Sequence, residues 1–131
     1  SNLYMKKLLA IIVVTLTCFS SANAEERVNL ICNADVSINM DTNEITSITG
    51  TKGITIFPDS KEYSFQGNSG SYLESGNLIT WIVGLGGRIV DKYYFDRVSG
   101  ELTDVFGIME DGKFKPALAQ KYKCKKTDAL F

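Results

Sequence analysis

Carboxylates are the side chains in this sequence that could perform acid–base chemistry, because its 131 residues include no histidine. Without histidine, Ser-His-Asp catalysis, Cys-His catalysis and histidine-ligated zinc are excluded. Two acidic pairs, Asp91 with Asp96 and Glu101 with Asp104, could supply the acid and base of glycoside cleavage. Both pairs lie beside basic and turn-forming residues, which is typical of solvated strand ends. The sequence therefore favours a protein that is not an enzyme.

Two further segments could bind small ligands but lack the context that such sites need. Residues 84–87 (Gly-Leu-Gly-Gly) would cradle a phosphate if a helix followed them, but the residues that follow are typical of a strand. Residues 41–44 (Asp-Thr-Asn-Glu) offer oxygen donors like the start of a calcium loop, without its turning glycine and closing glutamate. We therefore predict turns in both places, no metal site and no cofactor.

The cysteines predict one disulfide. Cys18 lies in the N-terminal segment that we expect to be removed, as described below, which leaves Cys32 and Cys124 as a pair. An even number of cysteines in an exported protein indicates a disulfide. Closing so long a loop stabilises a fold by roughly 4–5 kcal/mol in the chain-entropy model. The alternative, free thiols in a redox or metal site, lacks a Cys-x-x-Cys spacing and a histidine partner.

Candidate binding residues come from a small polar segment that ends in an aromatic residue. Residues 67–71 (Gly-Asn-Ser-Gly-Ser) precede Tyr72, and we expect them to form a mobile loop of the kind that often carries recognition. Tyr94 is added because neighbouring strand residues face opposite ways, so it points away from Tyr93 and Phe95. Trp81 lies among apolar residues of the same parity and is expected in the core. The binding candidates are Lys52, Asn68, Ser69, Ser71, Tyr72 and Tyr94.

The N-terminus is typical of a secretory signal peptide. Residues 1–4 precede Met5, which is followed by Lys6 and Lys7, an apolar run over residues 8–16, and an Ala-Asn-Ala site that ends at Ala24. The apolar run is too short for the roughly 20 residues that cross a bilayer. We expect residues 5–24 to be removed, residues 25–131 to form a single periplasmic or secreted domain, and no membrane insertion of that domain. Cleavage would leave 12 basic and 15 acidic residues, so we predict no nucleic-acid binding.

The elements that must position these residues are strands. From Val28 to Met40 every even position is apolar and most odd positions are polar, which predicts half-buried β-structure with a possible bend near Ala34-Asp35. Short apolar stretches then recur at intervals typical of strands, with turn-forming residues between them. One helical turn is conceivable over residues 116–121. The stretches cover residues 45–48, 54–57, 63–65, 72–73, 78–83, 88–95, 101–109 and 114–124.

This pattern predicts an all-β fold. We expect a small antiparallel β-barrel or strongly curved sandwich of about 7–9 short strands. Cys32 and Cys124 fall on inward-facing positions of strands near the two ends of the domain. Pairing these terminal strands would close the sheet and remove its edges.

Two short motifs carry a limited resemblance to a known family. The chain contains Ser69-Gly70-Ser71-Tyr72 and Thr51-Lys52-Gly53. In this it resembles the exported lysozyme inhibitors of the membrane-bound and periplasmic C-type group, which carry Ser-Gly-x-x-Tyr followed by Thr-Lys-Gly. Here the tyrosine comes one position early and the order of the motifs is reversed. Size, compartment, disulfide and acidic charge are also similar, which implies a disulfide-linked barrel that inhibits a basic lysozyme.

These observations predict an exported, non-enzymatic binding module. A barrel of this size fills its own interior, so we expect a protein partner, such as a cell-wall hydrolase like lysozyme, recognised through loops. The alternative is a structural or assembly factor of the cell envelope that acts through a sheet face or an unpaired strand edge.

Overall fold

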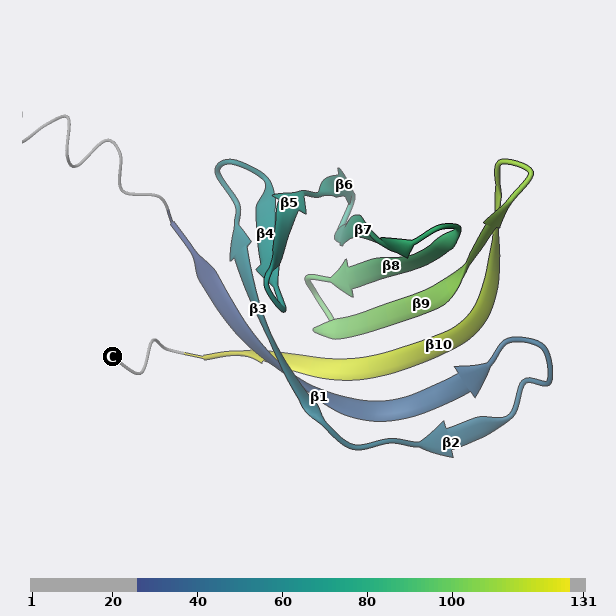
Figure 1. The fold of residues 1–131 in the computed structure, drawn as a ribbon. Coiled ribbons are helices and arrows are strands. Elements are labelled where there is room, and N and C mark those ends of the chain that lie inside the picture. The colour runs from purple at the N-terminus through teal and green to yellow at the C-terminus, as the bar shows by residue number, and fades with distance from the viewer. Residues whose placement is uncertain (1–25, 128–131) are drawn as a thin grey trace, which may run out of the picture.

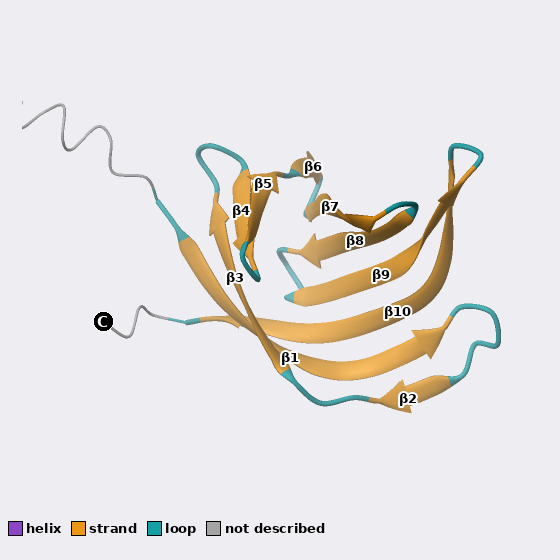
Figure 2. Cartoon of the chain, in the orientation of Figure 1, coloured by secondary structure: helices purple, strands orange, loops and turns teal. Residues whose placement is uncertain are grey.

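The computed structural model describes residues 26–127, which form strands joined by turns, with no helix in that part of the chain. The predicted signal peptide at residues 5–24 and the preceding residues 1–4 lie outside the described residues. Figure 1 shows the strands wrapped into a barrel, and Figure 2 shows the turns that join them. The strands are β1 (Val28–Asn39), β2 (Ile45–Ser47), β3 (Thr51–Phe57), β4 (Glu62–Phe65), β5 (Asn68–Ser71), β6 (Leu73–Ser75), β7 (Leu78–Gly86), β8 (Ile89–Asp96), β9 (Glu101–Glu110) and β10 (Lys113–Lys126).

The strands form one antiparallel sheet that curves into a nearly closed barrel, as the sequence predicted. Nine strands follow the order β5-β4-β3-β1-β10-β9-β8-β7-β6, and β2 pairs with β1 beside β3. The first and last long strands, β1 and β10, are therefore neighbours in the middle of the sheet. Cys32 lies directly opposite Cys124 in this pairing, and the two form the predicted disulfide. Closing the sheet leaves β5 in contact with β7 without a ladder between them.

A β-bulge in β1 divides the barrel into two halves. β1 is one continuous strand, and its register with β10 shifts between Ala34 and Val36, which leaves Asp35 as the extra residue at the place where a bend was possible. Residues 28–33 pair with β3, whereas residues 36–38 pair with the short strand β2. We call the end bounded by β3, β4, β5 and the start of β7 the closed half. The end bounded by β2 and residues 82–86 of β7 is the open half, on the right in Figure 1.

The bulge corrects one expectation from the alternating pattern. Leu30 and Cys32 point into the barrel and are buried. Beyond the bulge, Ser37 lies opposite Gln120, and Val36 and Ile38 move to the outer face. The even positions of β1 therefore do not share one face along its whole length, because one extra residue reverses the alternation.

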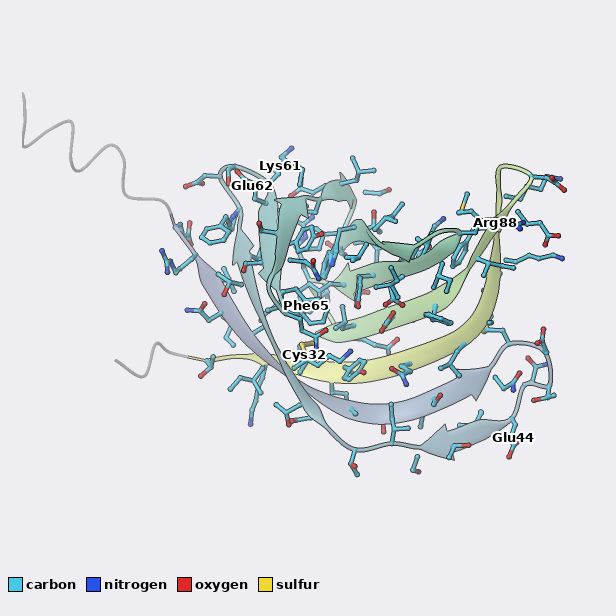
Figure 3. The ribbon with its side chains drawn as sticks, in the orientation of Figure 1. Cys32, Glu44, Lys61, Glu62, Phe65 and Arg88 are labelled. Carbon is cyan, nitrogen blue, oxygen red and sulfur yellow. A yellow bond between two sulfur atoms is a disulfide. The ribbon has the colours of Figure 1, made fainter. Side chains whose placement is uncertain are left out.

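Aromatic side chains fill the closed half. The Trp81 ring lies between the Tyr63 and Tyr93 rings, with centroid distances of 4.8 and 5.3 Å, and Phe65 meets Tyr93 edge-on. Trp81 is only 3% exposed, which confirms its predicted place in the core. Figure 3 shows Phe65 and Cys32 inside the curve of the sheet, with Glu44 and Arg88 at its periphery.

Two local predictions are wrong. Residues 68–71 are not a loop, because they form β5 and pair with β4 through the two-residue turn Gln66-Gly67, in which both residues have positive φ. This is the backbone conformation of the favoured β-hairpin turns. Residues 116–121 form no helical turn, because they belong to β10 and pair with β9 across a second bulge between Pro116 and Leu118. Residues 84–87 lie at the β7–β8 hairpin, as predicted.

Candidate functional site

The predicted binding residues do not form one surface. Asn68, Ser69 and Ser71 are exposed along β5, but Tyr72 is buried, with only 5% of its surface exposed. Burial also raises the pKa of the Tyr72 hydroxyl. Tyr94 is partly exposed on the face of β8 opposite to the buried Tyr93.

Lys52 instead belongs to a polar centre inside the barrel, which we define as Lys52, Asp91 and Asp104. Asp104 is buried, and the other two are partly exposed. The Lys52 Nζ lies 3.8 Å from the Asp104 Oδ2, and its ammonium stands over the rings of Phe65 and Tyr122. These contacts retain the lysine charge inside the barrel, because a buried cation is stable only beside opposite charge or the face of an aromatic ring.

Asp104 is the most strongly perturbed acid of this centre. It is 6% exposed, and burial raises its pKa to about 7. A hydrogen bond and repulsion from Asp91 raise it further, while the charge of Lys52 opposes the shift. The pKa of Tyr93 is also raised, first by burial and then by both carboxylates. The polar centre therefore gains or loses a proton near neutral pH.

The acid pair that could do chemistry is thus not one of the pairs read from the sequence. Asp91 and Asp104 lie diagonally across the β8–β9 ladder, since Tyr93 is the residue directly opposite Asp104. One carboxylate oxygen of each acid is buried without a hydrogen-bond partner. Among residues 26–127 there is no group of three His, Cys, Asp or Glu side chains that could hold a metal ion.

A hollow lies at the end of the closed half, where β1 begins and β10 ends. This mouth pocket has a volume of about 460 Å³, within the usual range for small-molecule sites. Its floor consists of apolar core side chains. They are Leu30, Ile56, Ile79 and Phe95, with Val28 and Tyr72 beside them.

The rim of the mouth pocket is basic. Arg97, Lys125 and Lys126 line it, together with the β8–β9 turn that carries Val98. Arg97 is held in place by Glu74 at 3.1 Å and by the carbonyl groups of the β6–β7 turn. Lys125 and Lys126 make no ion pair within the described residues.

The β8–β9 turn is fixed over this pocket by Gly100. The Cys124 amide donates a hydrogen bond to the Gly100 carbonyl oxygen, and Gly100 has a positive φ of 75°. A Cβ atom there would lie 2.7 Å from the Cys124 carbonyl oxygen, so glycine is what permits the close approach. The side of the pocket formed by Val98 therefore rests on the disulfide-bonded strand.

The second unusual surface is the free edge of β7, which we define as residues 82–86. β7 pairs with β8 along its length, but β6 pairs with it only at residues 78–80. Within the described residues, no backbone hydrogen bond links the free edge to another strand on its outer side. Ile82 and Leu85 on this edge are 61% and 50% exposed.

Sequence reasoning missed three features of these sites, two of which had some signal in the sequence. Asp104 alternates with Leu102 and Phe106, a pattern that would have placed an acid on an inward face. Lys126 shares the parity of Cys124, which would have turned it toward the barrel mouth. The free edge had no signal, because it depends on where β6 ends.

Comparisons with protein-family models, with curated proteins and with solved structures find no match to this chain. Along residues 26–127, no helix is long and apolar enough to cross a membrane. The disulfide is typical of proteins outside the cytoplasm. Function must therefore be inferred from the residues of the polar centre, the mouth pocket and the free edge.

Proposed function

We propose that this domain is a non-enzymatic binding module of the periplasm or extracellular space, and that a protein partner pairs with the free edge of β7. In this mode an extended segment of the partner adds a strand to the sheet, and main-chain hydrogen bonds supply much of the affinity. The observation that carries the proposal is the unpaired, apolar edge at residues 82–86. It favours the edge-binding alternative over recognition through loops.

The other edges of the sheet differ from this one in ways that discourage pairing. β2 and β6 have only three residues each, and β5 has the polar sequence Asn-Ser-Gly-Ser. Short and polar strands are the usual protection of a sheet edge against association. The free edge, with the sequence Ile-Val-Gly-Leu-Gly, has no charge and no proline. It is therefore the edge on which a partner strand gains most.

The proposal can be tested by adding a charge to the edge without disturbing the fold. Ile82→Glu places a carboxylate directly opposite Lys92 on β8, which makes a favourable cross-strand pair. Combined with Leu85→Glu, it adds two charges to the binding edge. Ile45→Glu on β2 is the matched control, because Ile45 is 65% exposed and Ile82 is 61% exposed.

Each variant is compared with the unmodified domain in affinity capture from envelope extract or culture fluid, with purified lysozyme assayed separately. We expect one partner to be lost with Ile82→Glu/Leu85→Glu and retained with Ile45→Glu, at unchanged melting temperature. Protection of the β7 amides from hydrogen exchange in the complex would locate the partner strand. Equal capture by all three proteins would contradict edge binding. A domain that elutes as a dimer, and as a monomer after the double substitution, would instead assign the edge to a second copy.

A further inference from the structure

The mouth pocket combines an apolar floor with positive charge at one side. Leu30, Ile56 and Ile79 form part of the floor, and all are less than 8% exposed, so the surface they present is continuous with the core. Such a surface gains free energy from any apolar group that replaces water on it. A ligand of this pocket therefore needs an apolar part that reaches the floor.

The positive charge of the rim determines which chemical group the other end of the ligand should carry. Lys126 lies opposite Leu30 in the β1–β10 ladder and so projects on the inner side, toward the pocket mouth. Lys125 and Lys126 are exposed and lack an ion pair among the described residues, while Arg97 is already engaged with Glu74. Lys126 is thus available for an anionic group at the entrance, whereas Lys125, which lies opposite Ile31, projects from the other face of β10.

We propose that the mouth pocket binds a single-chain amphiphile with an anionic head, such as a fatty acid, with the chain on the apolar floor and the head beside Lys126 at the rim that Arg97 also lines. A wholly apolar ligand would leave the Lys126 ammonium unused. A small polar anion would leave the floor uncovered, and the pocket volume of about 460 Å³ is larger than such an anion needs. The amphiphile is the chemical class that matches both surfaces.

This site is separate from the free edge of β7. The pocket contacts β7 at Ile79, whereas the free edge begins at Ile82 and runs toward the opposite end of the barrel. The two proposals therefore fail independently. Ile82→Glu/Leu85→Glu should leave amphiphile binding unchanged, and the pocket variants below should leave partner capture unchanged.

Chain length and head charge are tested with hexanoate, octanoate, decanoate and the uncharged decanol, each below its micelle concentration, by titration calorimetry on the full domain. Each added pair of methylenes should strengthen binding about tenfold until the pocket is full, because each buried methylene contributes about 0.8 kcal/mol. Chemical-shift changes should concentrate at Val28, Ile79 and Val98. Affinity that does not depend on chain length would overturn the proposal.

The head-group contact is tested by Lys126→Gln. We expect about tenfold weaker decanoate binding and unchanged decanol binding, because only the anion uses the lysine. The matched control is Lys125→Gln, which removes an exposed charge from the next residue of β10, on the opposite face of the strand. Equal weakening by both variants would mean that only the overall charge attracts the anion, which would contradict a site at the mouth.

Pocket occupancy is tested by filling the space. Val28→Trp places a large ring over the floor, and Val98→Trp narrows the entrance from an exposed turn position that the core does not depend on. Both should abolish decanoate and decanol binding while thermal unfolding stays cooperative. Retention of chain-length-dependent binding in the folded Val98→Trp protein, or in both variants, would overturn the assignment of the pocket.

Discussion

The closed and open halves of the barrel differ most clearly along one face of one strand. On β9, Leu102 in the closed half is fully buried, whereas Phe106 and Ile108 in the open half are 36% and 40% exposed on the same inner face. The difference arises because β3, β4 and β5 fold over the first end, while only the short β2 accompanies the second. A continuous strand thus contributes to a core at one end and to an exposed apolar surface at the other.

The polar centre lies at the boundary between the halves. Asp104 occupies the inner position between Leu102 and Phe106, and it is still buried. The aromatic stack ends beside it, at Tyr93. From the closed half to the open half, the aromatic core is therefore followed by the charged groups of the polar centre, and the inner face beyond them is exposed to solvent.

The sharpest test of this comparison is truncation of matched aliphatic residues on β9. Leu102→Ala should lower the free energy of unfolding by about 2–5 kcal/mol, because it leaves a cavity in the closed half. Ile108→Ala should cost about 1 kcal/mol or less, since the side chain is 40% exposed. Chemical denaturation measures both. Equal costs would mean that the open half is packed in solution, for instance against another molecule.

Backbone spacing in the open half is tested at two glycines. A Cβ atom at Gly107 would collide with the Lys115 carbonyl oxygen and the Phe114 ring, whereas a Cβ at Gly84 would meet nothing within 4 Å. We expect Gly107→Ala to destabilise the domain by about 1–3 kcal/mol, as overpacking does, and Gly84→Ala to be near neutral. Thermal unfolding of the two variants gives the comparison. If Gly107→Ala left the stability of the domain unchanged, this would show that β9 and β10 separate easily at this end.

The contribution of the polar centre, at this boundary, to the free energy of unfolding should depend on pH. Asp104 has a pKa raised to about 7, so between the usual carboxyl pKa and about 7 the folded domain holds a proton that the unfolded chain has released. The free energy of unfolding should therefore fall as pH rises through this window, by on the order of 1–2 kcal/mol between about pH 5.5 and about pH 8.5.

Asp104→Asn removes the titrating group and should flatten this pH dependence, because the amide stays neutral throughout. Thermal unfolding at both pH values, with Asp35→Asn on the exposed bulge as control, makes the measurement. If Asp104→Asn leaves the pH dependence of the free energy of unfolding unchanged, a group other than Asp104 is titrating.

Much of the fold could be predicted from the sequence, because each strand carries its own local signal. Alternation and turn-forming residues indicated the strands, and two cysteines of inward parity indicated the pairing of β1 with β10. The disulfide confirms that pairing. What could not be predicted depends on contacts between strands. The extra residue at Asp35 reverses the faces of β1, and no local pattern marks it apart from a possible bend.

The candidate sites were harder to predict for the same reason. Residues 68–71 have a loop-like composition, but pairing with β4 makes them a strand. Asp91 and Asp104 lie far enough apart in sequence that only the β8–β9 register brings them together. The sequence placed Lys52 among the surface binding residues. Its contact with Asp104 depends on the curvature of the sheet, which brings β3 close to β9.

The pairing of β1 with β10 has a consequence for the order of folding. The two strands at the centre of the sheet come from the two ends of the described chain, and the cysteines that join them are 92 residues apart in sequence. Because contacts this distant form late, the barrel cannot assemble until nearly all of the domain has been synthesised. A chain of this topology therefore stays open while it is being made, and the barrel closes only when its last strand arrives.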